Sequence, residues 1–236
     1  MARKRRTHGL VALFILAALG VGVAVTHDVS RAVSPADSAT ARTLLASRAG
    51  VPAEAAGFAH EVAIAVAVQD AVLAAAPLNE GIPEGTSREL TDLVRAGKGL
   101  CFDRSRAIET ILRSRGFEVR HASIYSTAET GSAIKSLATP RTESHAITEM
   151  KTRRGWMAID SNNRWIGLTA SGEPVDLAEI SAAPQQKWHP AVLEPLPPIY
   201  RKPFTWVYGL YSRHGRFYPP YNAVPDVSWP ELVQNL

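Results

Sequence analysis

The single cysteine of this 236-residue chain, Cys101, occupies a position at which a thiol becomes reactive. It follows the turn Gly97-Lys98-Gly99 and opens a stretch in which apolar residues recur at helical spacing. The first N–H groups of a helix have no partner within the helix and carry partial positive charge, which stabilises a thiolate. A nucleophilic cysteine also needs a base and a group that orients this base, and His145 and Asp160 supply both types later in the chain.

Each of these residues also has a purely structural interpretation. Cys101 could be a small buried core residue, since a lone cysteine forms no internal disulfide. His145 could be a hydrogen-bonded core histidine, and Asp160 could form a turn with Ser161-Asn162-Asn163. His121 is a rival base, but it follows the helix closely and is expected to face elsewhere.

The elements that would position these groups can be read from the sequence. Residues 59–76 predict a helix by length and alanine content, although the alternation of their β-branched residues leaves a strand open. Gln69 in this stretch is interpreted as a surface residue, with an oxyanion donor as the alternative. Residues 118–125 predict a strand, and 144–151 with 155–160 predict a hairpin. A register that opposes His145 and Asp160 places both on one face, and Gly155 indicates a bulge or a one-residue slip as the alternative.

Four blocks of sequence, taken in order, resemble the transglutaminase-like superfamily over roughly residues 60–170. The resemblance rests on a glycine-preceded cysteine, an "Arg-x-x-Gly" helix end, a "His-Ala" strand and a "Gly-Trp-x-x-x-Asp" strand. In this chain they read Gly99-Leu100-Cys101, Arg113-Ser114-Arg115-Gly116, His145-Ala146-Ile147-Thr148-Glu149 and Gly155-Trp156-Met157-Ala158-Ile159-Asp160. Ile147 replaces the usual aromatic residue, and Ser161-Asn162-Asn163 stands where the family often has proline.

The resemblance implies an α+β, transglutaminase-like (papain-like) fold, with the nucleophile helix packed against an antiparallel sheet. It implies a catalytic triad in which Cys101 attacks an amide carbonyl, His145 transfers the proton and Asp160 orients the histidine. It also implies that no metal or organic cofactor takes part. The expected substrate is a peptide or protein.

The charge of the chain is concentrated at its N-terminus. Arg3, Lys4, Arg5 and Arg6 equal the formal net charge of +4, so the remaining chain is formally neutral and nucleic acid is not an expected partner. The uncharged apolar run 9–25 follows. We expect an uncleaved signal-anchor, with a cleaved signal peptide or a structural helix as alternatives. The catalytic domain would then lie outside the cytoplasm, tethered to the membrane.

These observations divide the chain into four parts. Residues 1–26 are the signal-anchor or signal peptide, and 27–58 are a linker with one short helix. Residues 59–183 are the transglutaminase-like catalytic domain. Residues 184–236 are an extension rich in proline and aromatic residues that wraps the core, either completing it or covering a substrate groove.

The leading expectation is therefore an exported cysteine hydrolase of peptide or isopeptide bonds that works through a thioester. Two alternatives remain open: a protein-glutamine transglutaminase, and a catalytically idle module that binds a partner in the cell envelope. The sequence does not indicate an oligomeric state.

Overall fold

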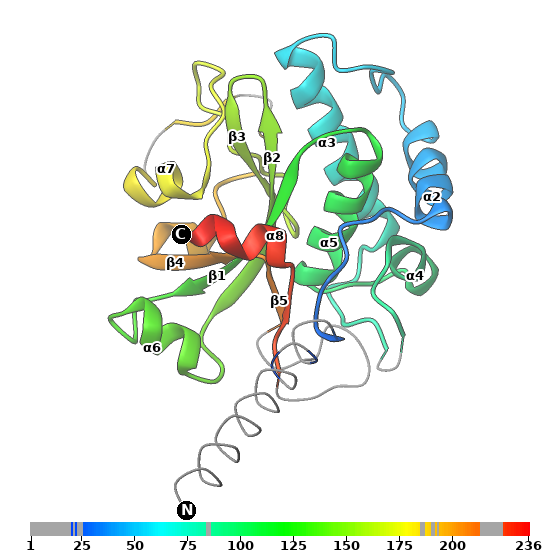
Figure 1. Ribbon diagram of the computed structural model, residues 1–236. Coiled ribbons are helices and arrows are strands. Elements are labelled where there is room, and N and C mark those ends of the chain that lie inside the picture. Colours follow the sequence, from blue (N-terminus) through cyan, green and yellow to red (C-terminus); the bar gives the residue numbers. More distant parts are fainter. Residues whose placement is uncertain are drawn as a thin grey trace, which may run out of the picture.

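The computed structural model describes residues 20, 22, 26–83, 86–184, 187–189, 192, 194–212 and 224–236. The predicted N-terminal membrane or signal helix thus lies almost wholly outside the described residues. Within them, the fold is a four-stranded antiparallel sheet with helices on one face and loops with short helices on the other (Figure 1). The helices are α2 (Pro35–Ala46), α3 (Phe58–Ala75), α4 (Leu90–Ala96), α5 (Cys101–Ser114), α6 (Ala133–Ala138), α7 (Leu177–Ala182) and α8 (Trp229–Leu232), with the 3-10 turns η1 (Pro198–Arg201) and η2 (Val233–Asn235).

The main sheet has the order β3-β2-β1-β4, and a two-stranded sheet pairs β5 with β6. The main sheet contains β1 (Val119–Ser126), β2 (Ser144–Thr152), β3 (Gly155–Asp160) and β4 (Phe204–Tyr208). The small sheet contains β5 (Leu210–Ser212) and β6 (Asp226–Val227). The α+β content and the antiparallel sheet confirm the predicted class of fold, and α5 packs against β2 as expected for a helix that carries the nucleophile.

Alternating side chains give the sheet two different cores. One face packs Met150, Met157 and Ile159 against α3 and α5. The opposite face packs Ile124 and Ile147 beneath Trp165, Tyr200 and other residues of the loops. The helix α5 begins after an extended Leu100, whose N–H donates to Asp103 Oδ2 at 2.9 Å, and ends before Gly116 at φ +83°.

Two predicted segments differ from the structure. Residues 27–58 are not a linker, because α2 packs on α5, α3 and α4 and buries Ala41 and Leu45 in the core. The segment 184–236 does more than wrap the core, since β4 hydrogen-bonds to β1 and forms an edge of the main sheet. The catalytic fold therefore extends beyond 59–183 in both directions.

Among the described helices, α3 is long and apolar enough to cross a membrane. It buries Ile64, Val68 and Val72 against the rest of the domain, and it packs against α5. A core helix of a folded domain meets the same length and hydropathy criteria, and the contacts of α3 are those of a core helix.

Candidate active site

Cys101 is the first residue of α5, where the sequence placed it, and its side chain is partly exposed. The turn before it is held tightly. A Cβ on Gly99 would lie 3.0 Å from the Leu93 side chain and 3.1 Å from Asp103 Cβ. Gly99 therefore serves close packing, rather than leaving room for a substrate. The thiol lies at the first turn of α5, where backbone N–H groups have no acceptor within the helix and can stabilise a developing oxyanion.

The hairpin brings His145 and Asp160 together from adjacent strands. His145 Nε2 lies 2.8 Å from Asp160 Oδ2, and the carboxylate is fully buried. The register between β2 and β3 differs by two residues from the one that opposes His145 and Asp160. Asp160 opposes Ile147 instead, because the chain turns at Arg153-Arg154 without a bulge. A shift of two preserves the face on which each side chain lies, so His145 and Asp160 still meet.

His145 also connects the sheet to α5. Cys101 lies close enough to His145 to raise the pKa of the imidazole, as Asp160 does. Nε2 of the ring is taken by Asp160, so Nδ1 is the nitrogen left for the thiol. The structure thus brings all three predicted site residues together, with the imidazole between the thiol and the carboxylate.

The electrostatics of the His145–Asp160 pair favour the charged forms of both groups. Burial alone lowers the pKa of His145, but the Asp160 carboxylate and Cys101 raise the pKa to about 10. Burial alone raises the pKa of Asp160, but His145, the Tyr200 hydroxyl and the Asn162 N–H together lower the pKa below its ordinary value. At neutral pH the pair is therefore an imidazolium beside a carboxylate.

Both oxygens of Asp160 are fixed by further donors. Tyr200, in η1, donates its hydroxyl to Oδ2 at 2.7 Å, and its ring lies edge-on to His145 with centroids 6.2 Å apart. Oδ1 accepts from the backbone N–H groups of Asn162 and Asn163, each at 2.8 Å. Sequence analysis missed Tyr200, since it is one of many aromatic residues in an irregular, proline-rich segment.

Gln69 is neither a surface residue nor an oxyanion donor. It is 2% exposed, and its Nε2 lies within 2.8–2.9 Å of three backbone carbonyls, those of Asp160, Asn163 and Trp165. The amide therefore holds the loop that follows β3. Its place in the helix, surrounded by apolar residues, was the signal that it is buried.

Arg104 ties the start of α5 to the same loop. Its Nη1 lies 2.6 Å from Asn162 Oδ1, and its Nε donates to the Ala76 carbonyl at 3.0 Å. Burial lowers the pKa of this guanidinium, while Cys101, Asp103 and Asp160 raise it. Arg104 therefore places a buried positive charge near the first turn of α5.

An open groove of about 200 Å³ lies beside His145. One side comes from the start of β2 and from Asn162 and Asn163, and the other side comes from Pro197, Pro198 and Ile199 of the C-terminal segment. The groove is thus bounded by His145 itself and by chain segments that adjoin Asp160 and Tyr200.

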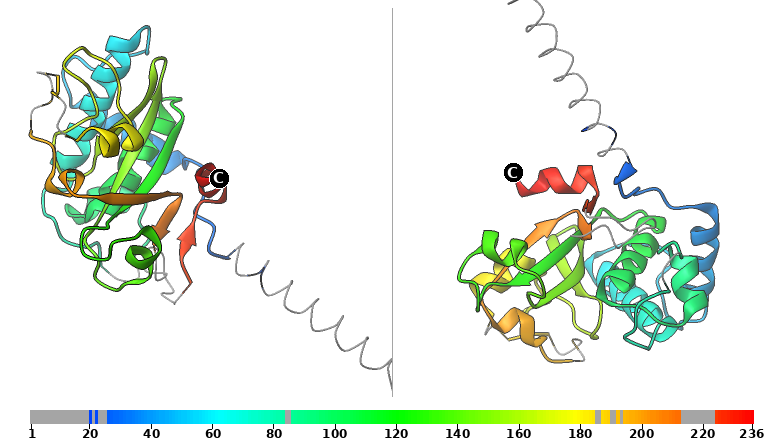
Figure 2. Two further views of the ribbon diagram at one scale, coloured as in Figure 1. Left: turned by 90° about the vertical axis from the view of Figure 1, so that its left-hand side faces the viewer. Right: turned by 90° about the horizontal axis from the view of Figure 1, so that it is seen from below.

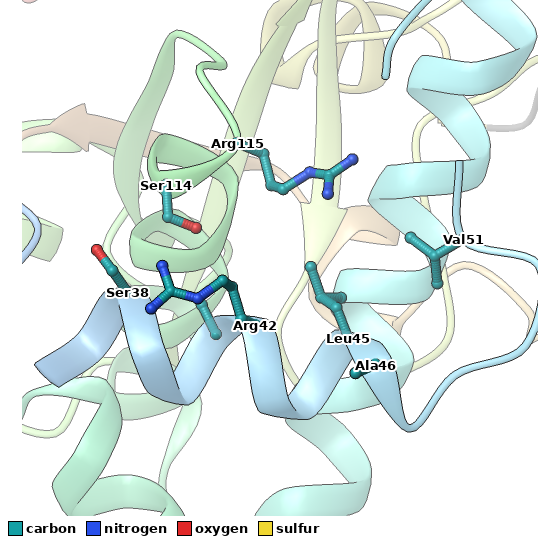
Figure 3. A pocket seen from close by; sticks show the side chains of 8 residues that line it. Ser38, Arg42, Leu45, Ala46, Val51, Ser114 and Arg115 are labelled. Atoms are coloured by element: carbon teal, nitrogen blue, oxygen red, sulfur yellow. The ribbon is translucent and has the colours of Figure 1, made fainter. Parts of the chain in front are cut away.

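A larger cavity, of about 450 Å³, lies between α2 and the end of α5. Figure 3 shows Arg42 and Arg115 at this cavity, with their guanidinium groups pointing in different directions. Arg115 donates to the carbonyls of Pro52 and Ala53, so its charge holds the chain between α2 and α3. This cavity lies at the opposite end of α5 from Cys101, and its lining residues include no cysteine, histidine or carboxylate.

The described residues contain no group of three or more histidine, cysteine or acidic side chains placed to hold a metal ion.

Of three comparisons with known proteins, one gives a match. A model of the transglutaminase-like superfamily matches residues 52–161, a stretch that includes Cys101, His145 and Asp160. Comparisons with curated proteins and with solved structures give no significant match. The match confirms the resemblance seen in the sequence motifs. Residues 52–161 of this chain are therefore similar to the transglutaminase-like superfamily, which includes cysteine hydrolases and transglutaminases.

Proposed function

We propose that this protein is an exported, membrane-tethered cysteine hydrolase that cleaves peptide or isopeptide bonds. The observation that carries the proposal is the pairing of His145 Nε2 with Asp160 at 2.8 Å, with Cys101 near enough to raise the pKa of the same imidazole. Such a relay lets one histidine accept and return a proton while its orientation is held.

The proposed reaction has two halves. The Cys101 thiolate attacks the carbonyl carbon of the amide, and the backbone N–H at the start of α5 stabilises the resulting oxyanion. The C–N bond then breaks, and the His145 imidazolium donates its proton to the leaving amine. A thioester to Cys101 remains.

Water resolves the thioester. Neutral His145 removes a proton from water, the hydroxide adds to the thioester carbonyl, and the C–S bond breaks to release a carboxylic acid and the thiolate. Asp160, held by Tyr200, keeps Nε2–H of His145 oriented through both halves. The open groove beside His145 supports access of water to the intermediate.

A transglutaminase differs only in the second half, where an amine in place of water attacks the thioester. Glu143 at the rim of the groove is an observation in favour of this second candidate, because a carboxylate attracts the ammonium group of an incoming amine. Glu143 is, however, paired with Lys202 at 2.6 Å, which reduces that attraction. We therefore place hydrolysis first.

The proposed location rests on the sequence of the N-terminal segment. The apolar run 9–25 preceded by four basic residues is typical of a signal-anchor whose basic end stays in the cytoplasm. The substrate would then be a peptide or protein of the cell envelope.

The experiment compares the wild type with Cys101→Ala on a mixture of envelope peptides and primary amines, read by mass spectrometry. Hydrolysis adds the mass of water to the cleaved bond, transamidation releases ammonia and joins two molecules, and an idle domain changes nothing. Ser105→Ala is the matched control, since Ser105 lies one turn further along α5 and is fully buried. Products that persist in Cys101→Ala would overturn the proposal.

A further inference from the structure

The C-terminal helical segment, α8 with η2, is held to the domain by polar contacts. Glu231 is fully buried: it pairs with Arg113, and its Oε2 accepts from the backbone N–H of His121 at 3.3 Å. Asn235 exchanges hydrogen bonds with both backbone groups of Tyr208, at 2.9 and 3.0 Å. The side of the segment that faces the protein is therefore its polar and charged side.

The opposite side of this segment is apolar. Trp229, Val233 and Leu236 expose 43%, 59% and 109% of their reference surface. An α-helical spacing of four followed by a 3-10 spacing of three brings these residues to one side, which we call the outer face. This is the reverse of a typical surface helix in a soluble domain, which turns its apolar stripe to the core.

The outer face also lacks charge. Residues 224–236 include two acidic residues, Asp226 and Glu231, and both are buried; the segment contains no lysine or arginine. The remaining exposed side chains there are proline, amide or aliphatic. An uncharged apolar surface indicates contact with an apolar partner.

The position of the outer face in the fold identifies that partner. Residues 27–29 run beside β6: Val29 N–H donates to the Val227 carbonyl at 2.7 Å, and Val227 N–H donates to the His27 carbonyl at 2.9 Å. His27 Nδ1 also lies 2.9 Å from Asp226 Oδ1. Figure 2 shows the first described residues and α8 on the same side of the domain. The apolar run 9–25 ends two residues before His27.

We propose that the outer face, Trp229 with Val233 and Leu236, rests on the lipid bilayer in which the N-terminal segment is anchored. The inference rests on the membrane location proposed above, but not on the reaction. Tryptophan favours the membrane interface, and an apolar helix face binds there by burying aliphatic side chains among the headgroups. The anchor raises the local concentration of the membrane surface, so a small contact is sufficient. The domain would then hold one orientation above the membrane.

The first experiment uses the full chain in phosphatidylcholine vesicles, with Cys101→Ser to remove the native thiol. A nitroxide is attached at Val233→Cys or, as the control, at Ile134→Cys, because Ile134 is 81% exposed on α6. We expect the label at 233 to be relaxed more by oxygen than by a water-soluble nickel chelate, and the label at 134 to show the opposite. Equal exposure of both labels to nickel would overturn the inference.

Other occupants give different results in the same experiment. A second copy of the chain would broaden the spectrum of the label at 233, and dilution with unlabelled protein would remove the broadening; this result also overturns the inference. If the full chain does not float with the vesicles, the proposed location fails and the inference fails with it. If the chain floats but the label at 233 stays in water, only the inference fails.

A second experiment avoids substitution at position 233. Brominated phospholipids quench tryptophan fluorescence on contact, so Trp229→Phe should remove most of the quenching that wild type shows in such vesicles. Trp206→Phe, on the edge strand β4, is the control and should retain the quenching. The same quenching in wild type and Trp229→Phe would contradict the inference.

Discussion

Two histidine–carboxylate pairs lie beside α5, and their hydrogen-bond distances are nearly equal. His145 lies 2.8 Å from Asp160, and His121 lies 2.7 Å from Glu109. Each carboxylate also accepts a buried phenol, from Tyr200 at 2.7 Å or from Tyr211 at 2.6 Å. By residue type and distance alone, both pairs could serve a nucleophile on α5: Cys101 for the first and Ser105 for the second.

The two pairs differ in their connections. In the second pair, Ser105 Oγ and Glu109 Oε1 both contact Nδ1 of His121, at 3.1 and 2.7 Å. Nε2 of His121 is buried and has no hydrogen-bond partner among the described residues. A proton cannot pass from a nucleophile through the ring to the carboxylate when both share one nitrogen. In the first pair, Asp160 takes Nε2 of His145 and leaves Nδ1 for Cys101, and an open groove adjoins the ring.

The second pair belongs instead to a buried network that holds the fold together. Burial raises the pKa of Glu109, but His121 and the arginines Arg113 and Arg106 lower the pKa to about 2, so this carboxylate stays ionised. Arg113 also pairs with Glu231 of α8. The network therefore connects the helix of the nucleophile to the C-terminal segment. In this comparison, connectivity and access to solvent, rather than residue type, distinguish the pair that we propose to be reactive from the pair that holds the fold together.

The largest effect that would test this comparison is expected at His145. His145→Ala should reduce turnover by roughly 1,000-fold or more, since members of a catalytic triad act as a unit. The rate at which iodoacetamide alkylates Cys101 should fall as well. The thermal midpoint should also fall, because Asp160 loses its buried partner, so turnover is compared per folded molecule. The measurements are product formation by mass spectrometry and alkylation against pH.

His121→Ala is the matched control for that experiment, and its folded fraction should keep the turnover of wild type. Retention of more than about a tenth of the activity by His145→Ala would contradict its place in the relay, because a triad base contributes far more than tenfold.

The second effect concerns stability at the buried pair. Glu109→Gln removes the charge that balances His121 and Arg113, and breaking a buried pair costs about 3–5 kcal/mol. The free energy of unfolding from denaturant titration should fall by this amount. Glu143→Gln, on an exposed ion pair, is the control and should change stability by less than about 1 kcal/mol. Equal losses of unfolding free energy in both variants would show that the buried network does not stabilise the fold more than an exposed ion pair does.

The two phenols should separate function from stability. Tyr200→Phe and Tyr211→Phe each remove one hydrogen bond to a buried carboxylate, worth about 1.5–3 kcal/mol. We expect Tyr200→Phe to lower turnover about tenfold or more and to shift the pH profile of alkylation, since Asp160 loses a donor that lowers its pKa.

Tyr211→Phe should lower the denaturation midpoint and leave the pH profile of alkylation unchanged. A pH profile that shifts in Tyr211→Phe but not in Tyr200→Phe would reverse the assignment of the two pairs.

The last effect concerns how stability depends on pH. The pKa of His145 is raised from 6.5 to about 10, so the folded state binds this proton more tightly than the unfolded state. The resulting stability is fully present below the unfolded value and is lost as pH rises toward 10. The difference in unfolding free energy between wild type and His145→Gln should therefore shrink from about pH 6.5 to about pH 10. A constant difference across this range would show that His145 is not charged by Asp160.

Much of the local structure was predictable because local interactions produce it. The helix from Cys101 follows from the periodicity of its apolar residues and from Gly116 at its end. The hairpin follows from two alternating strands around Arg153-Arg154. The strand register was wrong by two residues, since the position of a tight turn depends on packing of the whole sheet.

The residues that support the site were less predictable. Gln69 was interpreted as a surface residue, although it binds three carbonyls of the loop after β3. Tyr200 was not distinguished from the aromatic residues around it. Both act on backbone or side chains more than thirty residues away in sequence. Periodicity carries no information about such contacts.

The sequence by itself determined the class of fold, the order of the chemical groups and the helix start that carries Cys101, because propensity, periodicity and motif spacing act over short distances. The tertiary structure decided that Asp160 pairs with His145 and accepts from Tyr200, whereas Glu109 pairs with His121 and accepts from Tyr211. It also decided that the segments 27–58 and 184–236 belong to the folded domain. These features depend on contacts between distant segments, and the physical reason is that packing and hydrogen-bond geometry are settled only when the chain is folded.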